Sequence, residues 1–123
     1  MRLLVPTAGP NPAKQNAKYI VELARKLKAE LDVVHILDLA ADRAPGDEAL
    51  KIFKDHGNKL GVPVRTHMVE GNVVPTIVDM AEDQNSNLIV MGGSSGSLVA
   101  EWIVTDVMHK SPVPVVIIPY MAD

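Results

Sequence analysis

Residues 87–97 read Asn-Leu-Ile-Val-Met-Gly-Gly-Ser-Ser-Gly-Ser, and this stretch decides the fold class. Its run of large apolar residues without alternation is typical of a strand that is covered on both faces, inside a parallel sheet. The Gly/Ser turn that follows predicts a tight passage into a helix. Glycines allow positive φ angles and hydroxyls add donors, so the turn could hold a phosphate, or its serines could simply cap the helix. The turn alone leaves both interpretations open.

The composition favours one globular domain over residues 1–123. Hydrophobic residues make up 47% of the chain, enough for one buried core. A formal net charge of −3 without a Lys/Arg run argues against non-specific binding of nucleic acid. The apolar runs fall short of the ~20 residues of a membrane helix, and the N-terminus lacks the apolar length of a signal peptide. The absence of cysteine excludes disulfides and thiol catalysis. We therefore expect a cytoplasmic protein.

Strand and helix patterns alternate along the chain. Apolar runs predict strands at residues 2–5, 31–37, 62–68, 88–91 and 113–118, and Pro63 suits an edge strand. Apolar residues at helical spacing predict helices over about 12–27, 47–60, 73–81 and 97–110. Asn11 and Asn72 are the expected N-caps, and Gly61 is the expected C-terminal stop of the second helix.

This alternation predicts a three-layer α/β fold, with a doubly wound, five-stranded parallel sheet and four helices. We expect the first and fourth helices on one face and the second and third on the other. In such sheets, ligands bind beyond the carboxyl ends of the strands, where the strand order reverses. If the first and fourth strands are neighbours there, the loops at residues 6–11 and 92–97 face each other across one cleft, with Ile36 as a third wall.

Five motifs in a fixed order cover nearly the whole chain. They are Pro6-Thr7 after the first strand, His-Ile-Leu-Asp at residues 35–38, Glu70-Gly71, the strand and first glycine at residues 87–92, and Ser111 followed by residues 114–118. Together they resemble the universal stress proteins, small domains of the adenine-nucleotide α-hydrolase-like superfamily. The resemblance implies the strand order 3-2-1-4-5, frequent dimerisation through the last strand and, in one branch, ATP binding in the cleft.

That branch carries the pattern G-x2-G-x9-G-[S/T], which this chain matches only in part. Gly93 and Gly96 have the first spacing, but the second Gly-Ser pair is missing. Ala8 replaces the acidic residue usual after Pro-Thr. Trp102 stands near the place of the missing pair, and we expect its indole to fill the phosphate end of the cleft or to pack beneath it. We expect backbone donors near Gly93 and Gly96 to remain available.

The candidate nucleotide cleft therefore consists of residues from three strand ends: Pro6, Thr7, Ile36, Met91, Gly92, Gly93, Ser95, Gly96 and Ser97. ATP or AMP could bind there, although no cofactor is certain. The four histidines, at positions 35, 56, 67 and 109, lack the clustered spacing of metal ligands, and we expect structural or surface roles for them. No Ser/His/Asp order, paired loop carboxylates or P-loop lysine indicates catalysis.

Two function classes remain open. The first is a non-enzymatic stress-response or regulatory module that is dimeric and binds nucleotide poorly or not at all. The second is an ATP or AMP binder with a degenerate Gly/Ser loop; an enzyme ranks third. The last strand is very apolar for an edge strand, which predicts a twofold homodimer through Val113, Val115, Val116, Ile117 and Ile118. The sequence names no other protein partner, and it indicates neither nucleic acid nor membrane as one.

Overall fold

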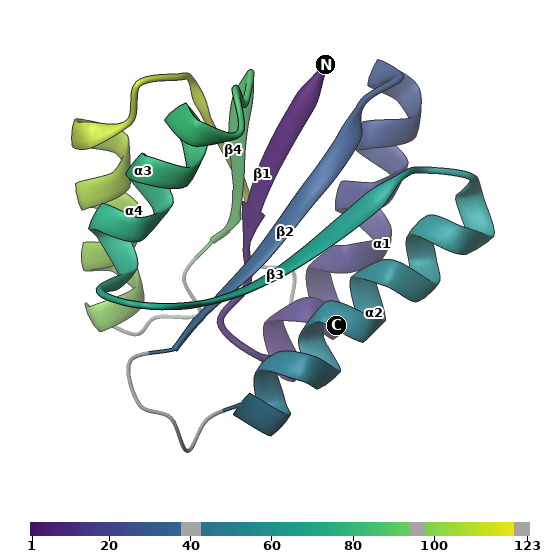
Figure 1. The fold of residues 1–123 in the computed structure, drawn as a ribbon, viewed down its shortest axis with the longest axis horizontal. Helices are drawn as coiled ribbons and strands as arrows, with labels where there is room; N and C mark the ends of the chain where they lie inside the picture. The colour runs from purple at the N-terminus through teal and green to yellow at the C-terminus, as the bar shows by residue number, and fades with distance from the viewer. Residues whose placement is uncertain (38–42, 94–97, 120–123) are drawn as a thin grey trace.

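The strands form one parallel sheet in the order β3-β2-β1-β4-β5 (Figure 1). The computed structural model describes residues 1–37, 43–93 and 98–119. Each neighbouring pair of strands is parallel. The predicted fold class and strand order are thus confirmed. The strands are β1 (Arg2–Pro6), β2 (Glu30–Leu37), β3 (Val64–Glu70), β4 (Leu88–Gly92) and β5 (Val115–Ile118).

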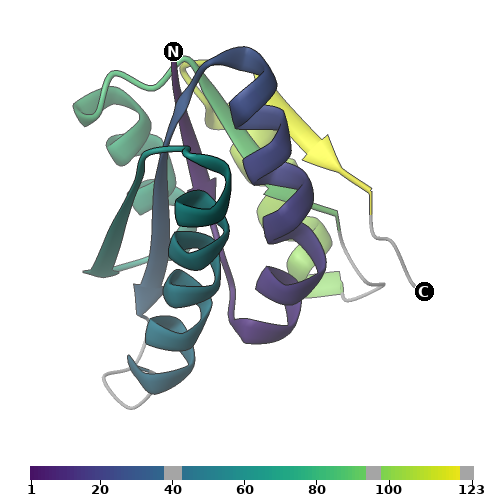
Figure 2. The ribbon, with the colours of Figure 1, turned by 90° about the vertical axis from the view of Figure 1, so that its right-hand side faces the viewer.

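Helices cover both faces of the sheet, but not in the predicted pairs. Helices α1 (Pro10–Leu27) and α2 (Arg43–Leu60) pack together on one face, and α3 (Val73–Asp83) and α4 (Leu98–Lys110) pack on the other (Figures 1 and 2). The prediction that the first helix shares a face with the fourth is therefore wrong. The chain moves in one direction from β1 through β2 to β3, so two right-handed crossovers place α1 and α2 on the same face. It then returns past β1 to β4 and β5, which places α3 and α4 opposite.

Each face of the sheet has its own apolar layer. Along β1, Leu3 and Val5 belong to the layer under α1 and α2, whereas Leu4 belongs to the layer under α3 and α4. This alternation follows from the two-residue repeat of a strand. Phe53 of α2 and Ile77 of α3 are the largest fully buried helix side chains of the two layers. The central strands are therefore covered on both sides, as their unbroken apolar runs predict.

Two helices begin earlier than predicted. Helix α1 begins at Pro10 with Gly9 at the N-cap position, not at Asn11. Helix α2 begins at Arg43 and not near Asp47, because Pro45 falls in the first turn, where its missing N–H has no helical acceptor. Gly61, just after α2, has a φ of 70°, as its predicted role requires. In the described part of the chain, no helix combines the length and the apolar content needed to cross a membrane.

Candidate functional site

A cleft of about 980 Å³ lies beyond the carboxyl ends of β1, β2 and β4. Six of the residues that the sequence predicts for the nucleotide cleft line it, from three different strand ends: Pro6, Thr7, Ile36, Met91, Gly92 and Gly93. The other three, Ser95, Gly96 and Ser97, lie outside the described residues. The cleft opens where the strand order reverses between β1 and β4, which is the position at which doubly wound sheets bind ligands.

The loop that leaves β1 is held in place by β2. The N–H of Thr7 donates to the carbonyl of Val34 at 2.9 Å. The carbonyl of Thr7 in turn accepts a hydrogen bond from Nδ1 of His35 at 2.8 Å. Because a carbonyl can only accept, Nδ1 of His35 carries a proton. His35 is 6% exposed, and its hydrogen bond fixes the shape of the cleft's first wall.

The His35 ring also packs against the backbone of α2 at Gly46. A Cβ atom at position 46 would stand 2.8 Å from Cγ of His35 and 3.0 Å from its Nε2. Those distances are shorter than van der Waals contact, so only glycine lets α2 approach the ring this closely. The wall therefore depends on three residues from three elements: Thr7, His35 and Gly46.

The glycine end of the cleft has fewer free donors than the sequence suggests. The N–H of Gly93 donates to the carbonyl of Ile118 at 2.5 Å. The prediction of an available donor at Gly93 is thus wrong, because the pairing of β4 with β5 extends one residue past β4. The first turn of α1 adds little, since Pro10 and Pro12 have no N–H. Ala8, in the place of the family's acid, lines the cleft without a polar group.

Trp102 does not occupy the cleft. Its side chain is 77% exposed, and Ile103 lines the cleft instead. Ile103 and Val107 lie one helical turn apart on the inner side of α4, which turns Trp102 toward solvent. The expectation that the indole fills the phosphate end or packs beneath it is therefore wrong.

Helix α1 contributes residues to the cleft that the sequence did not predict. Lys14 and Asn16 line it, together with Asn11 from the predicted loop. A usable signal is present in the sequence, because a helix that begins directly after the β1 loop must border the same end of the sheet with its first turns. The amide of Asn16 lies against Gly92, where a Cβ would be 3.2 Å from Cγ of Asn16.

Comparison with known protein families identifies the family of this chain. The model of the Universal stress protein family matches residues 1–119. This chain belongs to that family. A universal stress protein of Methanocaldococcus jannaschii is 30% identical over 107 residues, an alignment that covers 74% of this chain. The chain spans only 63% of the length of that relative.

Two solved universal stress protein structures share the fold of this one. The protein from Archaeoglobus fulgidus, in complex with dAMP, has a TM-score of 0.78 and 23% identity, with 96% of this chain and 97% of that chain covered. The protein from Arabidopsis thaliana, with AMP bound, has a TM-score of 0.74 and 16% identity, with 100% and 94% covered. At these identities the likeness supports the fold alone.

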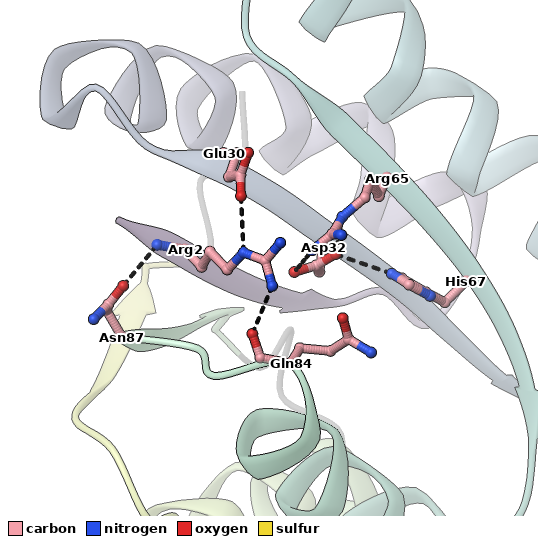
Figure 3. Close-up of polar contacts among 7 residues, drawn as sticks. All are labelled: Arg2, Glu30, Asp32, Arg65, His67, Gln84 and Asn87. Carbon is pink, nitrogen blue, oxygen red and sulfur yellow. Dashed lines mark hydrogen bonds and ion pairs between the residues drawn. The ribbon is translucent and has the colours of Figure 1, made fainter.

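A second polar cluster in this universal stress protein lies at the other end of the sheet, near the amino ends of the strands (Figure 3). Asp32 of β2 is fully buried. It accepts hydrogen bonds from Nε and Nη2 of Arg65 at 2.9 and 3.1 Å, and Nε2 of His67 lies 3.0 Å from Oδ1. The hydrogen bond and then the charge of Asp32 raise the pKa of Arg65 above its ordinary value. These contacts join β2 to the edge strand β3.

Arg2 extends this cluster toward β4. Its Nε donates to Glu30 at 2.8 Å and its Nη1 donates to the carbonyl of Gln84 at 2.9 Å (Figure 3). Its backbone N–H donates to Oδ1 of Asn87 at 2.7 Å. Among the described residues, no group of three or more His, Cys, Asp or Glu side chains could hold a metal ion. The cluster therefore ties strands and the end of α3 together.

Proposed function

We propose that this universal stress protein is a non-enzymatic, one-domain regulatory module that works as a twofold dimer and binds adenine nucleotides weakly. The observation that carries the proposal is the state of the cleft. It lies at the position of a ligand site, yet its glycine end has the Gly93 N–H already bonded to Ile118.

Relatives with this fold bind dAMP and AMP, which makes adenine nucleotides the ligands to test. This chain lacks the loop acid, which Ala8 replaces, and it lacks the second Gly-Ser pair. A hydrogen bond to a charged group contributes about 1.5–3 kcal/mol. The loss of two such bonds weakens binding by roughly a hundredfold or more. Weak binding is therefore expected from a cleft at the position of a ligand site that lacks these groups.

Calorimetric titration with ATP and with AMP tests this part of the proposal. We expect dissociation constants above roughly 100 μM for both nucleotides. Restoring the acid with Ala8→Asp should tighten binding about tenfold if that position faces the ligand. A dissociation constant in the low micromolar range for the unaltered protein would contradict the proposal.

The two edges of the sheet support dimerisation through β5. At β3, the carbonyl of Pro63 accepts from Leu31 of β2, so the next carbonyl, that of Val64, points outward. Nζ of Lys54 donates to it at 2.5 Å. Charged side chains on an edge strand and an occupied edge acceptor both hinder pairing with another chain. Arg65 and Glu70 on β3 are exposed and charged.

Strand β5 contains no charged side chain that would hinder pairing with another chain. Val115, Val116 and Ile117 are half-buried in the single chain, so each has apolar surface left to bury. A second copy related by a twofold axis would pair antiparallel with β5, while Pro114 removes one donor and limits further growth.

Light scattering at micromolar concentration tests the dimer. We expect the mass of two chains for the unaltered protein and of one chain for Val116→Asp, because the carboxylate would be buried in the interface. Thr66→Asp, an exposed position on β3, is the matched control and should stay dimeric. A monomeric unaltered protein, or dissociation by Thr66→Asp alone, would refute the assignment of β5.

A further inference from the structure

The amide of Asn16 is a polar group of the cleft with no hydrogen-bond partner among the described residues. It is half-buried in the second turn of α1 and lies against Gly92, at the start of the Gly/Ser turn. A side-chain amide offers two N–H donors and one acceptor. Partly buried amides are normally paired, so a free one that faces a cleft is available to a ligand.

Several backbone N–H groups that the described residues could offer at the cleft are engaged or missing. The N–H of Gly93 is bonded to Ile118 and that of Thr7 to Val34. The prolines at the start of α1 have no N–H. A side-chain donor in the described part of the cleft therefore gains importance for a ligand.

A cation lines another part of the cleft wall, beside α2. Lys14 of α1 lines the cleft, and its ammonium is exposed. It lies 3.9 Å from a carboxylate oxygen of Glu48, a loose surface contact that contributes little to stability. An anion with more charge than a single carboxylate could therefore replace Glu48 as its partner.

We propose that Asn16 binds the phosphate of an adenine nucleotide directly, while Lys14 adds positive charge to the cleft from the side of α2. This inference rests on the proposed nucleotide site. It assigns the phosphate to a side chain of α1, in place of the Gly93 N–H that the β4–β5 pairing engages. The phosphate is the part of the ligand concerned, because the amide lies beside Gly92, where the chain enters the Gly/Ser turn, and the charge of Lys14 favours an anion in the cleft.

Three substitutions of Asn16 distinguish a contact with the phosphate from a contact with the ribose. Asn16→Ala removes the donor, and AMP binding should weaken roughly tenfold to a hundredfold. Asn16→Asp keeps the size but places a carboxylate against the phosphate, so binding should weaken further. If the amide instead faced a ribose hydroxyl, the carboxylate would accept its hydrogen bond and Asn16→Asp would bind AMP at least as tightly as the unaltered protein. Asn16→Gln, which keeps the amide, should retain part of the affinity.

The measurement is a two-dimensional 15N NMR titration with AMP and with adenosine, which reads weak binding and gives a dissociation constant for each variant. The side-chain amide signal of Asn16 should shift with AMP and much less with adenosine. Lys18→Ala, on the exposed side of α1, is the control and should bind like the unaltered protein. Unfolding curves confirm that each variant is folded.

The outcomes distinguish the inference from the function on which it rests. If the unaltered protein shows no saturable shifts up to about 10 mM AMP, the nucleotide site itself is wrong and the inference falls with it. If AMP binds equally well to the unaltered protein and to Asn16→Ala, only the role of Asn16 is overturned. Tighter binding to Asn16→Asp would overturn the assignment to the phosphate.

Discussion

Replacing Gly46 with alanine sets two opposing effects against each other in the wall of the cleft. Within a helix, alanine is about 1 kcal/mol more favourable than glycine. Here, however, the new methyl group would stand 2.8 Å from Cγ and 3.0 Å from Nε2 of His35. The ring is 6% exposed and its Nδ1 is bonded to the carbonyl of Thr7. It can therefore move aside only by breaking that hydrogen bond.

The structure indicates which effect is larger. Overpacking a buried site costs about 1–3 kcal/mol, and losing the bond to Thr7 costs about 1 kcal/mol more. After the helix gain is subtracted, Gly46→Ala should lower the free energy of unfolding by about 1–3 kcal/mol. For a chain of this size the midpoint of thermal unfolding should fall by roughly 4–12 °C.

Urea denaturation followed by far-ultraviolet circular dichroism measures the change. Fluorescence is a poor probe, because the single tryptophan, Trp102, is 77% exposed in the native state. The control is the same substitution in a His35→Ala background, where the ring is gone and Gly46→Ala should stabilise by about 1 kcal/mol. If Gly46→Ala also stabilises the unaltered protein by that amount, the contact between His35 and α2 does not constrain the wall.

Three further predictions concern the sheet and its ends. The hydroxyl of Ser86 is buried without a partner in the described residues, so Ser86→Ala should raise the free energy of unfolding by about 1 kcal/mol in urea denaturation, and a loss of stability would indicate a missed partner. Asp32→Ala should lower it by about 2 kcal/mol, because Arg65 and His67 lose their shared acceptor, whereas Glu30→Ala, at a half-exposed ion pair, should change it by a few tenths. If Asp32→Ala and Glu30→Ala changed the free energy of unfolding equally, burial of the carboxylate would not determine how much its contacts stabilise the fold. Lys54→Met removes the cation at the carbonyl of Val64 and should promote concentration-dependent association beyond a dimer in light scattering, while a mass unchanged at all concentrations would show that β3 needs no such protection.

Local chemistry made the strands and the cleft predictable. The apolar run before Gly92 specifies a covered strand wherever it occurs, and the rule of the reversed strand order places the cleft without any knowledge of side-chain packing. Pro6, Thr7 and Ile36 could be assigned to the cleft because they end strands. The faces of the helices follow from the same crossover rule, applied to the order in which the chain visits the strands. The pairing of α1 with α4 is wrong because it neglects the direction in which the chain crosses the sheet, which the strand order specifies.

The buried ion pair between Asp32 and Arg65 could not be predicted from the sequence, for a different reason. Asp32 stands between Leu31 and Val33 in an apolar run, and nothing local indicates its partners. The partners lie on β3, where the register places Asp32 beside Arg65. His67 lies two residues further along β3, on the same face of the strand. Only the pairing of two strands separated by α2 brings an acceptor and its donors together. A buried carboxylate in a strand is therefore a reason to search the neighbouring strand for cations, once the order of strands is known.

The free donors of the cleft depend on pairing in the same way. From the sequence, Gly93 carries an N–H in a Gly/Ser turn and looks available to a phosphate. Whether it is available depends on where β5 ends relative to β4, and the register that sets Gly92 beside Ile118 brings the carbonyl of Ile118 to the N–H of Gly93. A glycine that directly follows a strand thus offers its N–H to a ligand only where the neighbouring strand ends before reaching it. In this protein β5 reaches Gly93 and engages its N–H, which makes the side chains of α1 that line the cleft the stronger candidates among the described residues for contact with a ligand.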